Sequence, residues 1–459
     1  MANSPAARVS RKTYGLPTLT MLVIASMVGT GVFTTSGFTL GAVGSPLRVM
    51  LCWTIGGVIA ICGAVGYGRL AGLLPESGGE YLYLSRHVHP LAGFLAGWVS
   101  LTAGFSGAIA TAAVGFESYA IPETARPHWL PPDTIAVVVV VLCGLLHGVE
   151  KVWGKYFQNA VVLIKVVALA AFVALVVVRI PEHPWQLHQM SPDAPGGFKL
   201  VTAIATSVVW ISLSYAGFNA AIYVASESFE ARRVVPQALL LGTVAVVVLY
   251  LVLNLIFVTS TTAEQLVWKE DIAAVAAHAI GGRHMELLVR CAVALGLLSS
   301  VSGMVLTGPR VYSQMADDGV FPELFRADRQ GISKSIALQT AIAVGLILLQ
   351  RVLVSQGWLE SSLLGLLIYL STTLSLTSAC CVATLFLPSV RHADPDRSAR
   401  HTLAAAVYVV ATLLAMVLLM ISHQQDGQTQ GVWHLTGAAA TFATGIIAWF
   451  VVGRRRPTA

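Results

Sequence analysis

Residues 16–38 read LPTLTMLVIASMVGTGVFTTSGF, an apolar run that carries Gly29, Thr30 and Gly31 near its middle. A helix of about 20 apolar residues is long enough to cross the hydrocarbon layer of a membrane. Glycine weakens helix regularity and lets the backbone unwind or approach another group closely. The stretch therefore predicts a membrane-spanning helix that is interrupted near Gly29.

A second interruption is predicted in the apolar run at residues 200–226, which contains the string SYAGFN at 214–219. Interrupted spans at corresponding places in two halves of a chain are typical of transporters built from inverted repeats. For either run alone, an alternative stays open, in which the small residues only allow two helices to pack closely. Two interruptions at matching places favour the transporter interpretation.

The composition agrees with a membrane protein. Of the 459 residues, 56% are hydrophobic and 11% are charged, and the mean hydropathy is +0.75, whereas soluble domains are about 25% charged. These values exclude a water-soluble enzyme, a disordered regulator and a small disulfide scaffold. The apolar runs at 135–146 and 244–253 lack the alternation of a membrane β-barrel, so we expect an all-α protein.

The apolar runs between polar breaks predict twelve spans. They cover residues 16–38, 46–72, 90–121, 133–149, 156–179, 200–226, 237–260, 286–316, 334–353, 360–388, 402–421 and 434–453. Two polar segments have helical spacing of their own. Residues 76–88 predict an amphipathic helix along the inner surface, and residues 262–282 predict a helical lid on the outer side.

The basic residues indicate the orientation. Most of the 28 Lys and Arg residues fall on the side of the N-terminus, and the positive-inside rule then places both termini in the cytoplasm. The net charge of +6 reflects this topology, so we expect no nucleic-acid partner. We expect no cleaved signal peptide, because the first apolar run is too long for one. The six cysteines lie in apolar runs without C-x-x-C spacing, and we expect no metal and no cofactor.

Two broken helices define the chemistry of a ligand. An unwound helix offers free N–H groups and a positive dipole end on one side and free carbonyl groups on the other. A carboxylate suits the first and an ammonium group suits the second. A zwitterionic amino acid therefore satisfies both without a charged side chain in the protein.

Four strings carry a resemblance to a known family: MVGTGVF at 27–33, PESGGEYLYLSRHVHPLAGFLAGW at 75–98, SYAGFNAAIYVASE at 214–227 and RRVVPQAL at 232–239. They resemble the amino acid, polyamine and organocation transporter (APC) family. The resemblance implies a single transmembrane domain over residues 1–459, with a first five-helix repeat at about 16–179. An inverted second repeat at about 200–388 and two additional helices at about 402–453 complete it. It implies a multi-pass permease of the cytoplasmic membrane, surrounded by lipid, and not an enzyme.

The resemblance also implies roles for individual residues. The carboxylate would bind at the first break, to Gly29, Thr30, Gly31 and Val32. The amine would bind at the second break, to Tyr215, Ala216 and Gly217. The polar side chains of Ser106 and Asn219 would line the pocket. Leu213 departs from the family, many members of which have an aromatic gate there. Ala103 stands near the place of a glutamate found in cationic amino acid transporters, which favours a neutral substrate. A polyamine or other organocation transporter of the same fold is the alternative.

Lys165 stands inside the fifth predicted span, where a charge costs about 2.5–3.5 kcal/mol to insert. In the family such a lysine resembles a substitute for the second sodium ion of sodium-coupled relatives, close to hydroxyls of the eighth helix. Ser299, Ser300 and Ser302 are candidates for those hydroxyls. We therefore expect sodium-independent transport, coupled to protons or operating by exchange. Snorkelling of Lys165 to the surface is the alternative.

Charged residues at the inner ends of the spans predict a cytoplasmic gate formed by Glu227 and Arg86, with Glu230 and Arg232 nearby. Simple solvation of these charges is the alternative. Ser106 lies in a G-x-S-G string, which would also fit an intramembrane serine protease, but neither His147 nor His278 falls well inside a span. A channel is disfavoured because broken helices suit an occluded site better than an open pore.

Overall fold

The computed structural model describes residues 14–76, 78–122, 125–149, 167, 170–179, 183–187, 190–326, 329–359, 361–392, 398–425 and 430–453. Across these residues the chain forms helices and no β-strand, and one isolated bridge joins Tyr14 to Ser228. This confirms the all-α prediction. Lys165 lies outside the described residues.

The first half of the chain contains helices α1 to α7. Their bounds are α1 Leu16–Met27, α2 Gly31–Val43, α3 Pro46–Leu73, α4 Gly79–His87, α5 Pro90–Val99, η1 Ser100–Gly107, α6 Ala108–Ala120 and α7 Thr134–Val149. Prolines begin α3 and α5, where a missing N–H costs nothing, and Gly44 ends α2 in the left-handed conformation with a φ of 70°. These prolines and this glycine therefore place the helix boundaries within a few residues of the predicted ones.

The second half begins at α9. Its bounds are α9 Gly197–Ser214, η3 Ala220–Glu227, α10 Ala231–Thr259, α11 Ala263–Leu266, α12 Ile272–Asp317, η4 Glu323–Phe325, α13 Arg329–Ser355, α14 Ser362–Ala383, η5 Thr384–Phe386, α15 Pro388–His392, α16 Ala399–Gln425, α17 Gln430–Ala448 and η6 Trp449–Gly453. The predicted lid at 262–282 is confirmed as helical: it comprises α11 and the first part of α12, which bends at Gly282. The predicted amphipathic helix at 76–88 is confirmed as α4.

Eight described helices are long and apolar enough to cross a membrane, and a ninth span follows if the bent pair α1 and α2 is counted as one. Shorter apolar helices lie at 134–148, 170–179 and 436–452. Large apolar side chains such as Leu145 and Val410 are about 60% exposed on the outside of the bundle, as expected for lipid-facing positions. The chain is a multi-pass helical membrane protein, and the count of twelve spans stays a prediction.

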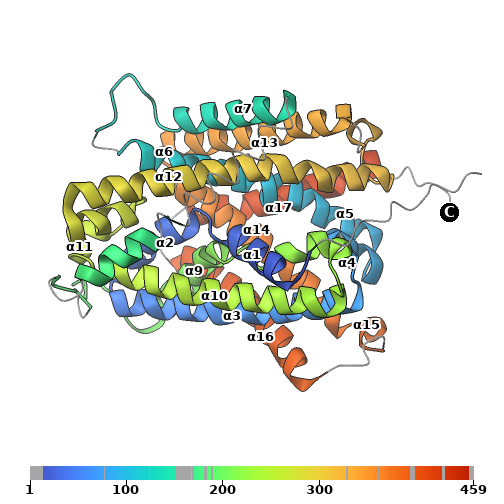
Figure 1. The fold of residues 1–459 in the computed structure, drawn as a ribbon, viewed down its shortest axis with the longest axis horizontal. Coiled ribbons are helices and arrows are strands. Elements are labelled where there is room, and N and C mark those ends of the chain that lie inside the picture. Colours follow the sequence, from blue (N-terminus) through green and yellow to red (C-terminus); the bar gives the residue numbers. More distant parts are fainter. Residues whose placement is uncertain are drawn as a thin grey trace, which may run out of the picture.

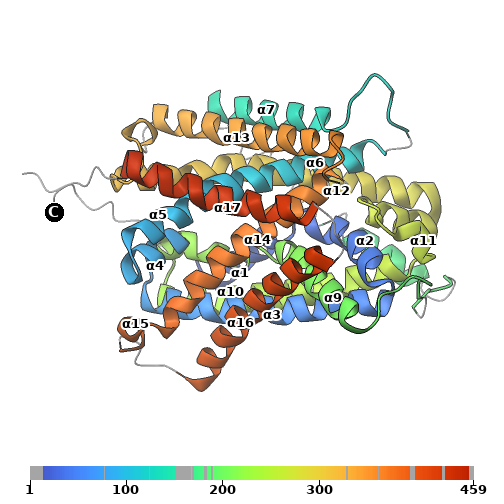
Figure 2. The same cartoon turned by 180° about the vertical axis from the view of Figure 1, so that it is seen from behind.

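The helices form one elongated bundle (Figure 1). Helices α3 and α10 run side by side along one edge, and α7 and α13 run along the opposite edge. Helices α1, α2 and α9 lie between these edges, and the view from behind agrees (Figure 2). We call the two ends of the bundle the α4 end and the α11 end. The predicted topology assigns them to the cytoplasm and to the outside, respectively.

Candidate functional site

The first predicted interruption is confirmed. Helix α1 ends at Met27, helix α2 begins at Gly31, and the two are bent by 44° at the break. The carbonyl oxygen of Met27 accepts a hydrogen bond of 2.7 Å from the Tyr250 hydroxyl on α10. A side chain from another helix thus satisfies a carbonyl group that the end of α1 leaves without a helical partner.

The second predicted interruption is also confirmed. Helix α9 ends at Ser214, residues 215–219 form turns, and the chain continues as the 3-10 helix η3. Gly217 has a φ of +96°, a conformation that L side chains rarely adopt. Within this turn the Ala216 N–H donates to the Leu213 carbonyl at 3.0 Å, and the Ala220 N–H donates to the Gly217 carbonyl at 3.0 Å.

The two breaks touch each other. A Cβ atom on Gly31 would lie 2.2 Å from the Ser214 Oγ and 2.7 Å from the Ser214 Cα. A Cβ atom on Gly217 would lie 2.7 Å from the Ser26 carbonyl oxygen. The hydroxyls of Thr35 and Ser214 are 3.2 Å apart across the same junction. Only glycine permits this approach, so the glycines allow both the unwinding and the close packing that the sequence left as alternatives.

Aromatic side chains support the junction from one side. Trp53 on α3, Tyr215 in the second break and Tyr250 on α10 are buried and pack with ring centroids 5.3–5.6 Å apart. The Tyr215 hydroxyl donates to the Trp53 carbonyl at 3.2 Å. The Trp53 indole N–H donates to the Ser36 Oγ at 2.7 Å, and Ser36 donates to the Asn254 Oδ1 at 2.5 Å. These bonds link α2 to α3 and α10 just beyond the first break.

The junction combines opposite ends of two helix dipoles. Gly31 and Val32 form the first turn of α2, where N–H groups have no helical acceptor and the dipole is positive. Helix α9 ends at Ser214, where the dipole is negative and carbonyl groups are free of helical donors. A positive and a negative helix end therefore meet in the buried centre of the bundle. This arrangement suits a small molecule that carries both charges.

The pocket-lining residues predicted from the sequence lie in different surroundings. Thr30 is buried at the first break, and its Cγ2 methyl group lies against Gly115 on α6. Ser106 lies in the π-helix η1, which packs against α12, α13 and α14, and its buried hydroxyl has no hydrogen-bond partner among the described residues. The Asn219 Nδ2 donates to the Glu80 Oε1 at 3.2 Å, toward the α4 end.

The three serines predicted to act with Lys165 all lie on α12. The Ser300 hydroxyl donates to the Gly296 carbonyl of its own helix at 3.0 Å, the usual behaviour of a serine in a membrane helix. The Ser302 hydroxyl lies 2.8 Å from the His147 Nε2 of α7, and Ser299 is buried. His147, a candidate partner of Ser106 in the protease hypothesis, is therefore bonded to Ser302.

The predicted gate residues are spread over the α4 end and the junction. Arg86 forms an ion pair of 3.9 Å with Glu76, and both side chains are more than half exposed. The Glu227 carbonyl oxygen accepts a hydrogen bond of 3.1 Å from the Tyr14 N–H. Leu213, near the end of α9, packs with Val99 and Ala103 in a small apolar cluster.

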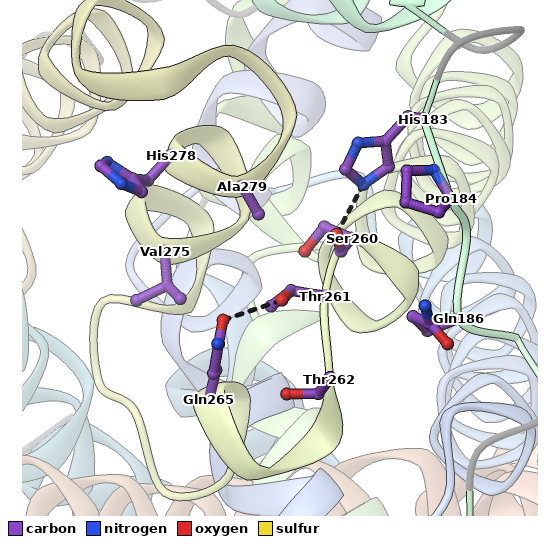
Figure 3. A pocket seen from close by; sticks show the side chains of 10 residues that line it. All are labelled: His183, Pro184, Gln186, Ser260, Thr261, Thr262, Gln265, Val275, His278 and Ala279. Atoms are coloured by element: carbon purple, nitrogen blue, oxygen red, sulfur yellow. Dashed lines mark hydrogen bonds between the residues drawn. The ribbon is translucent and has the colours of Figure 1, made fainter.

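The structure also contains a pocket of about 330 Å³ at the α11 end. It is lined by His183, Pro184 and Gln186, by the segment after α10, by α11 and by the start of α12. The His183 Nε2 bonds the Ser260 carbonyl oxygen at 2.6 Å (Figure 3). None of the residues of the two breaks lines this pocket. The pocket lies at the α11 end and is therefore separate from the junction between the breaks.

Comparison with known families decides the identity of this architecture. A profile described as "Amino acid permease" matches residues 14–451, nearly the whole chain. The chain belongs to the amino acid permease family. The family is one of transporters, in agreement with the resemblance inferred from the sequence, and the serine protease hypothesis finds no support in it.

Several relatives of this permease are amino acid transporters by name. The human Asc-type amino acid transporter 1 is 23% identical over 68% of this chain and 61% of its own length. The large neutral amino acids transporter small subunit 2 of Rattus norvegicus is 24% identical over 68% of this chain and 60% of its own length. The cystine/glutamate transporter of Pongo abelii is 22% identical over 95% of this chain and 84% of its own length. The permease thus spans about three fifths of the length of the first two relatives.

Sequence reasoning missed several residues of the permease site. Tyr250 and Asn254 lie in the string LYLVLNLIF at 249–257, where two polar groups interrupt an otherwise apolar run. Such interruptions signal a position that faces the interior of a bundle, because polar groups rarely face lipid. Trp53 and Glu80 gave no comparable signal, since Trp53 packs against Tyr215 and Tyr250 and Glu80 bonds Ser378, all of them distant in the sequence.

Proposed function

We propose that this permease is a secondary active transporter that carries neutral amino acids across the cytoplasmic membrane by alternating access. The observation that supports the proposal most is the contact between the two breaks, which brings the positive end of α2 beside the negative end of α9. The amino acid carboxylate would bind the N–H groups of Gly29, Thr30, Gly31 and Val32. Its ammonium group would bind the carbonyl groups of Tyr215, Ala216 and Gly217.

The proposed site needs no charged side chain to bind an amino acid, and this supports a neutral substrate. Main-chain dipoles at the two breaks balance both charges of the amino acid backbone, so the remaining pocket only needs to fit an uncharged side chain. Among the relatives, one is named as a transporter of large neutral amino acids. In this proposal both termini and the α4 end face the cytoplasm, and the two halves of the chain are inverted repeats that move against each other.

The proposed energy source is independent of sodium. Lys165 would occupy the place of a sodium ion in the fifth span, beside the hydroxyls of α12, so transport would run by proton symport or by exchange. Ser299 is buried on α12, and we expect it to contact the lysine.

The purified permease in liposomes tests the proposal. We expect saturable uptake or exchange of at least one neutral amino acid from a panel of the standard amino acids plus putrescine. Replacing sodium by choline in the same panel should leave the rate unchanged, because no sodium ion takes part. Preference for putrescine over every amino acid would favour the organocation alternative, and a strict requirement for sodium would contradict the role of Lys165.

A further inference from the structure

Glu80, on α4, is a carboxylate buried at the α4 end of the bundle. Glu80 is only 6% exposed to solvent. The Oε1 atom accepts hydrogen bonds from Ser378 on α14 at 2.9 Å, from the Asn219 amide at 3.2 Å and from the Tyr67 hydroxyl on α3. Three donors from three separate parts of the fold therefore converge on one carboxylate oxygen.

The groups around this carboxylate are neutral at physiological pH. The titratable side chains that face it are those of Tyr67 on α3, Tyr223 on η3, Cys381 on α14 and Tyr408 on α16. No Lys, Arg or His in the described part of the chain forms an ion pair with Glu80 or shifts its titration. The negative charge is thus held by hydroxyl and amide donors alone.

Burial without a cation favours the neutral form of a carboxyl group. Burial raises the pKa of Glu80, and the hydrogen bonds from Tyr67 and Ser378 counter only part of this effect. If the α4 end opened to water, the carboxylate would regain hydration and its pKa would return toward the ordinary value of about 4.3. The closed arrangement therefore binds a proton more tightly than an open one.

The sign of the coupling follows from this difference. Below the ordinary pKa both arrangements are protonated, and the closed arrangement has its full stability. As the pH rises from there to the raised pKa, the closed arrangement is progressively destabilised, because it alone still holds the proton. Acid thus favours closure of the α4 end, and neutral or higher pH favours opening.

Resting on the proposed transport function, we propose that Glu80 is a proton-binding site that links the pH at the α4 end to the closing of that end. The site consists of Glu80 with Tyr67, Asn219 and Ser378. One proton from water at the α4 end joins one carboxylate oxygen on closing and returns to that water on opening. Asn219 belongs to the turn that follows α9, so the second break and the Glu80 site share this residue.

The test is exchange of a neutral amino acid in liposomes, measured from pH 4.5 to 8 with the same pH on both sides. We expect wild-type exchange to slow as the pH falls. Glu80→Gln carries a permanently neutral side chain of the same shape, so its exchange should be slow and independent of pH. The control Glu323→Gln, a carboxylate with a side chain 77% exposed in η4, should keep the wild-type profile.

Two donor variants separate a proton site from a merely structural role. Tyr67→Phe and Ser378→Ala each remove a hydrogen bond that stabilises the ionised carboxylate, so the midpoint of the pH profile should move up by about one unit. These variants decide the question even if Glu80→Gln fails to fold. Unmoved midpoints, a wild-type profile in Glu80→Gln or a flat wild-type profile would each overturn the proton site. Absence of exchange at every pH in the wild type would instead contradict the transport function itself.

Discussion

Replacing Gly217 by alanine is expected to lower the rate of amino acid exchange at least tenfold while leaving insertion into the membrane intact. Gly217 has a φ of +96°, and its added Cβ would lie 2.7 Å from the Ser26 carbonyl oxygen of α1. Strain of this kind costs about 1–3 kcal/mol, and the atom in the way is backbone that cannot rotate aside. The two breaks would separate, and the positive and negative helix ends would no longer face one ligand.

Gly345→Ala is the matched control for this variant. Gly345 lies within α13, and a Cβ there would meet no heavy atom within 4 Å. Alanine is favoured over glycine in a helix by about 1 kcal/mol, so this variant should transport like the wild type. Initial rates of counterflow in liposomes, normalised to the amount of folded protein, measure both variants. Wild-type exchange by Gly217→Ala would show that the contact between the breaks has no part in transport.

The second large effect concerns stability at the α11 end. Glu117 on α6 is 2% exposed, and its carboxylate accepts hydrogen bonds from the Arg126 Nη1 at 2.6 Å, the Asp133 N–H at 2.8 Å and the Ala136 N–H at 2.9 Å. It therefore caps the N-terminus of α7 from a neighbouring helix and pairs with a mostly buried arginine. Removing one partner of a buried ion pair costs about 3–5 kcal/mol.

Glu117→Ala should accordingly lower the midpoint of thermal unfolding in detergent by about 5 °C or more. The exposed Glu264 on α11 provides the control, since Glu264→Ala removes a carboxylate without buried partners and should shift the midpoint by less than about 1 °C. Equal midpoints for the two variants would mean that the Glu117 network contributes nothing to stability. The three donors to the Glu117 carboxylate indicate a structural role for this residue.

Much of the fold could be predicted because the bilayer imposes strong local rules. Apolar runs bounded by Pro46, Gly44 and Pro90 predicted helix boundaries within a few residues, since backbone polar groups must pair inside each helix. The two breaks could be predicted from their glycines. The first break, predicted near Gly29, comprises Val28, Gly29 and Thr30, whereas Gly31 and Val32 already belong to α2.

The rest of the site depends on contacts between distant segments, which one sequence does not reveal. Tyr250 reaches the end of α1 across 223 positions, and Ser378 reaches Glu80 across 298. Glu80 itself lies in a polar string that predicts a surface helix, and its burial becomes apparent only when α3, α14 and the turn after α9 close over it. Asn219, which the family resemblance assigned to the substrate pocket, donates a hydrogen bond to this carboxylate.

The most direct test of the central claim, that the two breaks together bind a zwitterion, is inhibition of exchange by three related compounds. These are the best neutral substrate, the amine that lacks its carboxylate and the acid that lacks its ammonium group. Each lost group removes charge-assisted hydrogen bonds worth about 1.5–3 kcal/mol, so both truncated compounds should inhibit at least about tenfold more weakly than the amino acid. Inhibition by either truncated compound at the concentration that suffices for the intact amino acid would contradict the claim.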